Sequence, residues 1–528
     1  MEKKAPENVS DPFRIDKNEP SSPFKFSSSE IVLAWVMLAI GFLYWNLLLE
    51  AWGFGLTLFT LIISGVTLIF LNKSGFRQTC RSWFWLAVLL LCALSFSIFA
   101  ATLLNFVKFL FLNAVFMYWL SVSTGRNLND DLSAYLIGDA FNQIFIVPFS
   151  NFLYCFKGLK ASLSGRKNSK NVLYLLLGMV IFFPFIAAVL KLLMAADSAF
   201  AQFIWHLGDV IVPGSNIIDY IFQFLLGIPV AFYLYGLIFG NVHDLGEGRF
   251  KRETLERAAL NIRIAPQLTI YSALTVFNVI YILYTVFQST YFFSSLTGSL
   301  PDSFTYAEYA RKGFFELCAV ASINLAVMLI AYVFIKRGSH EEPKALRVQL
   351  LCLSLLTILL IITAGSKMIM YINFYGLTPM RTYTSWFMAL LFFVFTVILI
   401  RQLKKFNASK WLASGALALF MLLTFSNADG FIAHYNIERY KSGTLNRLDL
   451  DMLGSLSDAA IPHIYALYQD MGQSDPDDRM LKARLKNLIV VKNPLEEGNG
   501  IYNYRNFNWQ KYNAREISRE IQKPAAYL

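Results

Sequence analysis

The residues best suited to binding or acid–base chemistry gather in three segments that border long apolar runs, at 306–317, 373–387 and 427–440. Guanidinium groups bind carboxylates and phosphates, and a carboxylate can act as a general base. We predict a ligand-binding site from the charged and aromatic side chains of these segments, namely Glu308, Arg311, Glu316, Tyr375, Arg381 and Asp429. A lipid head group or another anionic ligand would suit such a site.

A structural interpretation of the same residues stays open. Charged side chains near helix ends can reach the membrane surface and pair with one another. Glu308 and Arg311 are three residues apart, so on a helix they would share a face and could simply form an ion pair. For ligand binding, we expect Glu308 and Arg381 to matter most.

Known catalytic and cofactor motifs are absent from the sequence. It contains no P-loop, no HExxH zinc motif and no GxSxG nucleophile elbow. The five histidines are far apart, and the five cysteines form no CxxC pair. We therefore predict no metal and no cofactor, assign no catalytic residue, and favour a protein without enzymatic activity.

Composition indicates a membrane protein. Of the 528 residues, 56% are hydrophobic and only 15% are charged, whereas soluble proteins carry about a quarter charged residues. Apolar runs long enough to cross about 30 Å of hydrocarbon recur along the chain. The predicted fold is therefore all-α and polytopic, with the lipid bilayer as its surroundings. The net charge of +11 does not indicate nucleic acid, because the basic residues cluster in loops on one side of the membrane.

Eleven apolar segments qualify as membrane spans. They are 31–49, 53–71, 83–101, 105–122, 172–193, 218–239, 267–291, 314–335, 350–372, 385–400 and 411–426. The third and fourth are separated by only a few residues, so whether both cross fully stays open.

Sidedness follows from the distribution of Lys and Arg. If the N-terminus lies inside, the tail and the inner loops hold 27 of these residues and the outer loops hold three. Basic residues are retained on the cytoplasmic side during insertion, so this asymmetry supports the assignment. Eleven spans then put the region after residue 426 outside the membrane, and Arg381 becomes one of three cations in the outer loops.

The spans divide the chain into five predicted regions. In the inner segment, apolar residues between Phe149 and Leu159 recur at helical spacing with Lys157 and Lys160 among them, which is typical of an amphipathic helix on the inner leaflet. The regions are a disordered cytoplasmic tail (1–30), a four-span membrane region (31–122), the amphipathic inner segment (123–171), a seven-span core (172–426) and a small helical extracytoplasmic domain (427–528).

Four sequence elements occur in a fixed order, EYARKGF, YGLTPMRTY, NADGFIAHYN and LSDAAIP. With these elements, residues 130–465 resemble a bacterial family of polytopic membrane proteins known as domain of unknown function 4153, together with the overlapping family 4173. One departure is the pair Gly430-Phe431, where the pattern favours a smaller or aliphatic pair. The resemblance implies a multi-pass protein of the bacterial cytoplasmic membrane, but it implies no activity, ligand or partner.

Three functional hypotheses remain. We favour a non-enzymatic scaffold, sensor or transport component of the cell envelope that binds an extracytoplasmic anionic ligand or an envelope partner at the outer interface. A membrane-embedded transferase acting on a lipid head group is the alternative, with Glu308 or Asp429 as base and Arg311 and Arg381 as anion binders. A transporter comes third, and its cavity would reach the bilayer midplane near Pro184 and Pro229.

Overall fold

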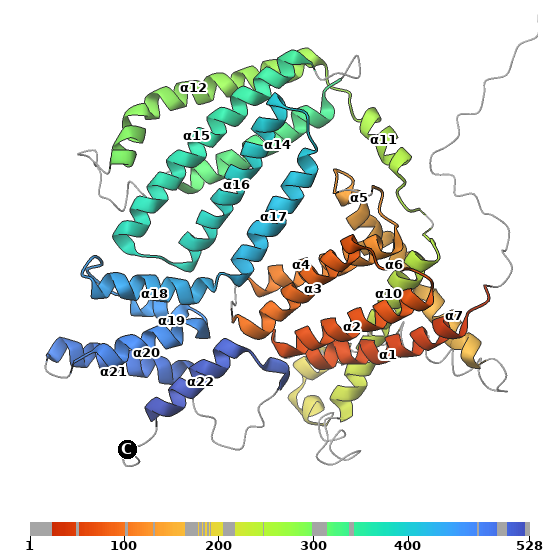
Figure 1. Ribbon diagram of the computed structural model, residues 1–528. Helices are drawn as coiled ribbons and strands as arrows, with labels where there is room; N and C mark the ends of the chain where they lie inside the picture. Colours follow the sequence, from red (N-terminus) through yellow and green to blue (C-terminus); the bar gives the residue numbers. More distant parts are fainter. Residues whose placement is uncertain are drawn as a thin grey trace, which may run out of the picture.

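The computed structural model is helical throughout the residues that it describes (Figure 1). These residues are 24–48, 52–100, 104–129, 132–163, parts of 178–203, 217–246, 248–297, 314–336, 343–472, 475–493 and 504–522. Within them, the one β feature is an isolated bridge between Ala265 and Ile335.

Ten of the described helices are long and apolar enough to cross a membrane. They are α1 (Ser28–Leu48), α2 (Phe54–Lys73), α3 (Cys80–Ile98), α4 (Asn105–Thr124), α10 (Ile217–Val242), α12 (Gln267–Thr297), α14 (Phe314–Phe334), α15 (Lys344–Tyr375), α16 (Pro379–Leu403) and α17 (Ala408–Phe425). They match ten of the eleven predicted spans, and the remaining one, 172–193, lies mostly outside the described residues. The predicted class, a polytopic helical membrane protein, is confirmed.

A first group of helices consists of α1, α2, α3, α4 and α10, with α7 (Phe152–Leu163) packed against α1 and α10. The backbones of α1 and α10 approach closely where Gly41 faces Gly227. A Cβ atom on Gly227 would lie only 2.5 Å from the main-chain carbon and oxygen of Gly41. Small residues allow the two helices to come this close. Inside a membrane, close packing of this kind drives helix association, because the hydrophobic effect does not act between helices in lipid.

A second group consists of α12, α14, α15 and α16, with α17 packed on α16. Polar side chains link three of these helices. Tyr281 of α12 donates a hydrogen bond to Asn324 Oδ1 of α14 at 2.6 Å, and Asn324 Nδ2 donates to Thr357 Oγ1 of α15 at 2.9 Å. On the side of the first group, Phe420 of α17 packs on Phe111 of α4, with ring centroids 4.6 Å apart.

The C-terminal helices form a third packed group at the end of α15, α16 and α17 (Figure 1). They are α18 (Ala428–Lys441), α19 (Leu450–Ser455), η2 (Asp458–Ala460), α20 (Ile461–Asp470), α21 (Pro476–Lys492), η3 (Tyr504–Asn506) and α22 (Trp509–Gln522). Leu453, Ile464 and Leu485 of this core are fully buried. Asp475 caps α21, because its side chain accepts a hydrogen bond from the Asp477 amide.

The C-terminal helices are also tied to the first group through main-chain atoms. Asn508 Nδ2 donates to the Phe96 carbonyl at 2.9 Å, and the Ala100 amide donates to Gln510 Oε1 at 2.8 Å. The Phe54 amide donates to the Phe507 carbonyl at 2.9 Å. The C-terminal helices therefore contact the start of α2 and the end of α3 as well as the second group.

Short helices cover the opposite ends of the first group. They are α5 (Leu136–Phe141), the π-helix η1 (Asn142–Ile146), α6 (Val147–Ser150) and α11 (Arg252–Asn261). Asn142 Nδ2 donates to the Phe250 carbonyl at 3.0 Å, and the Phe250 amide donates back to Asn142 Oδ1 at 2.9 Å. The segments before and after α10 are thereby joined.

The glycine contact between α1 and α10 gives a first prediction. Gly227→Ala should lower the free energy of unfolding by about 1–3 kcal/mol, because its methyl group would force two backbones apart. Gly65→Ala on α2 is the matched control, since no atom lies within 4 Å of the position of its Cβ. Thermal unfolding of the purified protein in detergent would compare the two, and equal midpoints would contradict the close contact.

Candidate functional site

The predicted site residues from 306–317 do not form a described cluster. Glu308 and Arg311 lie outside the described residues. Glu316 lies in the first turn of α14, where its side chain is exposed. Ligand binding by these three residues stays a prediction.

A short turn between α15 and α16 holds two other predicted residues. The predicted loop around Arg381 is reduced to Gly376–Thr378, because α15 runs to Tyr375 and α16 begins at Pro379. Gly376 has a φ of +76°, which L side chains rarely adopt, and it ends α15. Thr378 caps α16 by accepting a hydrogen bond from the Arg381 amide at 3.3 Å.

Arg381 binds the end of the preceding helix. Its Nη1 donates to the carbonyl oxygens of Tyr375 and Gly376 at 3.2 and 2.6 Å. The guanidinium carbon also lies 4.0 Å from the centroid of the Tyr371 ring, a cation–π distance. Both hydrogen bonds come from Nη1, which is one of the three guanidinium nitrogens. A guanidinium has five N–H donors in all.

Two residues of α18 bind the same helix end. Arg439 Nη1 donates to the Ile372 carbonyl at 3.1 Å, and its Nη2 donates to the Asn373 carbonyl at 2.7 Å. Asn436 makes a pair of hydrogen bonds with Leu377, accepting from its amide at 2.7 Å and donating to its carbonyl at 2.8 Å.

Arg381, Asn436 and Arg439 together form what we call the α15 cap. The last turn of any helix leaves carbonyl groups without intrahelical partners, and its partial negative charge attracts cations. Here charged donors bind four carbonyls between Ile372 and Gly376, of which that of Ile372 also accepts a hydrogen bond from the Gly376 amide. At the edge of a membrane this matters more than in water, because unsatisfied carbonyl groups cost several kcal/mol in hydrocarbon.

Asp429 belongs to a separate set of contacts. Its side chain is buried and its Oδ2 accepts a hydrogen bond from the Ser457 amide at 3.0 Å. Lys492 Nζ donates to the carbonyls of Gly454 and Leu456, which lie just before Ser457 in the chain. Burial lowers the pKa of Lys492, while the nearby carboxylates of Asp458 and Asp429 raise it. Asp429 therefore ties α18 to the turn before η2.

A polar cleft of about 1030 Å³ opens beside the α15 cap, between the α15–α16 turn and the C-terminal helices. Sites for small molecules commonly enclose about 300–1,000 Å³. Its wall includes three basic residues (Arg381, Arg447, Arg484), four acidic residues (Asp449, Asp451, Asp477, Asp478) and three aromatic residues (Phe374, Tyr375, Tyr440). Tyr375 and Arg381 thus share one cleft, and Asp429 does not line it.

Several of these charges are available to a ligand. Arg447 and Arg484 are exposed, and the structure records no ion pair for either within the residues that it describes. Asp449 is used internally, since its Oδ1 accepts a hydrogen bond from the Met452 amide at 2.9 Å and caps α19. Arg381 stands at the membrane end of the cleft, and the acidic residues come from the C-terminal helices.

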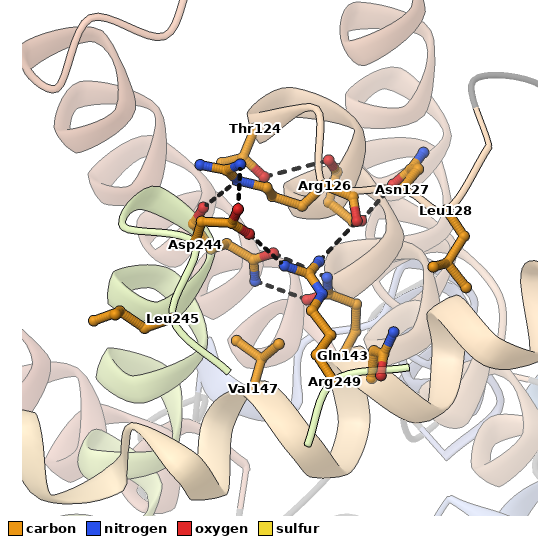
Figure 2. A network of polar contacts seen from close by, with 12 residues as sticks. Thr124, Arg126, Asn127, Leu128, Gln143, Val147, Asp244, Leu245 and Arg249 are labelled. Carbon is orange, nitrogen blue, oxygen red and sulfur yellow. Dashed lines mark hydrogen bonds and ion pairs between the residues drawn. The ribbon is translucent and has the colours of Figure 1, made fainter. Parts of the chain in front are cut away.

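A second polar cluster lies at the other end of the first group, and Figure 2 shows its side chains pointing toward one another. Asp244 forms ion pairs with Arg126 at 2.9 Å and with Arg249 at 3.0 Å. Arg249 Nη2 also donates to the Arg126 carbonyl at 2.7 Å. Beside them, the Gln143 and Asn241 side-chain amides exchange hydrogen bonds at 2.9 and 2.7 Å.

Sequence reasoning missed this cluster. In the sequence, Arg126 and Arg249 stand out only as basic residues of predicted inner loops. Their shared partner, Asp244, lies in a different loop from Arg126. In the structure, Asp244 has a φ of +56°, in the left-handed region that Asp adopts more readily than most residues. Burial lowers the pKa of Arg249, although Asp244 raises it. The cluster joins two loops and is structural.

The α15 cap gives a second prediction. Asn436→Ala should destabilise the C-terminal helices by about 1–3 kcal/mol for each Leu377 group left buried without a partner. Hydrogen exchange of the Leu377 amide should accelerate, because the side chain that it binds is removed. Asn487→Ala, on the exposed face of α21, is the control and should leave this exchange unchanged. An unaltered exchange rate in Asn436→Ala would contradict the cap.

A pH dependence follows from a histidine pair on α18 and α20. The rings of His434 and His463 lie 5.2 Å apart. Burial and then His434 lower the pKa of His463, while Glu438 raises it. The unfolded chain then binds more protons than the folded one, so stability present at neutral pH is lost as the pH falls below about 6.5. His463→Gln should flatten the fall in melting temperature between neutral pH and pH 5.5, and parallel curves would contradict this.

Comparison with known proteins agrees with the motif analysis. A family model described as Domain of unknown function (DUF4153) matches residues 86–467. No curated protein and no solved structure matches the chain. The matched region begins within α3 and ends within α20, so it includes the α15 cap and Asp429. The predicted resemblance is confirmed, and the chain belongs to the DUF4153 family of membrane proteins.

Proposed function

We propose that this protein is a non-enzymatic component of the bacterial cell envelope that binds a polar extracytoplasmic ligand in the cleft beside the α15 cap. The observation that carries the proposal is the lining of the cleft, which brings the exposed Arg447 and Arg484 together with Arg381 and several carboxylates at the edge of the membrane-spanning helices. In this role it would act as a scaffold, a sensor or a transport component.

The location outside the cytoplasmic membrane is supported by the charge count and by contacts that agree with it. The first is the excess of Lys and Arg in the loops predicted to be inner. The second is that the C-terminal helices contact the start of α2 and the ends of α3 and α15. The charge count predicts that each of these helix ends is an outer one.

The chemistry of the wall favours a ligand with charges of both signs. Arg381 and two aromatic rings, Phe374 and Tyr375, stand at the membrane end, where an anionic group such as a phosphate would meet a fixed guanidinium. Asp451 and Asp478 stand on the C-terminal helices, where they would accept hydrogen bonds from an ammonium or hydroxyl group. A zwitterionic lipid head group combines these features.

A transferase acting on a lipid head group at the same face is the alternative. It needs a carboxylate that can reach a bound substrate, and Asp451 and Asp478 line the cleft. The base would then differ from the predicted Glu308 or Asp429. A transporter is the third candidate, and it gains support from an apolar cavity lined by Pro229.

A cysteine in the cleft tests the binding proposal. In a Cys80→Ser background, Asn446→Cys should react with a membrane-impermeant maleimide in intact cells, since Asn446 lines the cleft. On purified protein, short-chain dihexanoylphosphatidylethanolamine should slow this labelling several-fold by occupying the cleft. Arg447→Gln combined with Arg484→Gln should remove that protection.

Ala466→Cys is the matched control, because Ala466 is exposed on α20 and does not line the cleft. The lipid should leave its labelling rate unchanged. Labelling of Asn446→Cys only after the cells are permeabilised would overturn the outer location. Equal rates with and without lipid would overturn a head-group ligand.

A further inference from the structure

An apolar cavity of about 430 Å³ lies inside the first group of helices and shares no lining residue with the cleft. Its walls come from α1, α2, α3, α4 and α10, together with Phe149 of α6 and Phe152 of α7. The lining is almost entirely apolar, with Thr60 and Asn113 among the few polar residues. Its volume is that of a site for a small ligand.

Pro229 of α10 lines the cavity and explains how a gap can persist there. A proline inside a helix removes one backbone hydrogen bond and kinks the axis. Two residues before Pro229, Gly227 lies tightly against Gly41 of α1. After it, Val230 and Leu234 line the cavity together with Leu112 of α4.

The cavity ends at two aromatic residues that lead to the surface. Phe149 is 60% exposed, although it lines the cavity, so it stands at the mouth. Phe152 stacks parallel to it with ring centroids 6.4 Å apart. Tyr233 packs its ring against Phe149 at 5.7 Å, and its hydroxyl donates to the Ile144 carbonyl at 2.9 Å. The mouth is therefore a fixed aromatic frame.

A basic stripe continues from this mouth along α7. Leu153, Lys157 and Lys160 follow one another on α7 at intervals of four and three residues, so they share one side of that helix. All three are exposed, as is Phe149 of α6 just before it. The other side of α7 is buried at Cys155. Apolar side chains thus stand next to the mouth and lysines stand beyond them. This order matches that of an acyl chain and its head group at a membrane surface.

From this arrangement, we infer that the first group binds one anionic phospholipid, with an acyl chain in the cavity beside Pro229 and its phosphate at Lys157 and Lys160. The surroundings favour a lipid over a soluble ligand, because the cavity lies among membrane-spanning helices and its walls offer little polar contact. Lysines near a membrane surface attract anionic lipids. This inference does not depend on the outer cleft.

Native mass spectrometry of the full-length protein would test the site with two lipids that share the same chains. Dioleoylphosphatidylglycerol should bind about tenfold more tightly than dioleoylphosphatidylcholine, because only the former carries a net negative charge that two lysines can meet. Lys157→Gln combined with Lys160→Gln should abolish this difference. Lys404→Gln combined with Lys405→Gln removes the same charge from exposed positions after α16 and should preserve it.

Filling the cavity tests the acyl-chain part separately. Val230→Phe should weaken the binding of both lipids, because the larger ring occupies the space beside Pro229. Thr60→Leu fills the same cavity from α2 and serves as a second variant should the first fail to fold. Equal affinities for the two lipids in the unaltered protein would overturn the head-group site. Undiminished binding in a folded cavity variant would overturn the location of the chain.

Discussion

The end of α15 sets the constraint on which the arrangement of the C-terminal helices depends. Its last carbonyl groups lie at the edge of the membrane-spanning region, where lost hydrogen bonds are costly. Arg439 and Asn436 supply partners from α18, so these helices are held by directional bonds as well as by apolar contact. A shift of α18 along α15 would break the two charge-assisted hydrogen bonds of Arg439 and the pair of bonds between Asn436 and Leu377 at once.

The same cap shapes the candidate site. Arg381 is fixed by two carbonyls and an aromatic ring, so its guanidinium stands at one place in the wall of the cleft. A rigid donor loses little freedom when a ligand binds, which favours affinity. Structural and binding roles for Arg381 are therefore compatible, because the capping bonds use one guanidinium nitrogen and a guanidinium has five N–H donors in all.

The sequence predicts the spans well and their contacts poorly, for physical reasons. Apolar length and the distribution of basic residues depend on local composition, so ten of the described helices fall where the spans were expected. The partners of Arg381, Arg439 and Asp429 are main-chain groups, which no count of opposite charges can identify. The contact between Gly41 and Gly227 joins residues far apart in the chain, and only the folded backbone reveals it.

Both helical groups meet the C-terminal helices, and this connection has a mechanical consequence. A main-chain hydrogen bond joins Phe507 to Phe54, while the Arg439 side chain binds two carbonyls at the end of α15 in the other group. A displacement of the C-terminal helices therefore acts on α2 and α15 together. A ligand that bridges the α15–α16 turn and α21 would hold the C-terminal helices in place, and these in turn would restrain both membrane-spanning groups. This coupling suits a sensor or a scaffold better than an independent binding domain on a flexible linker.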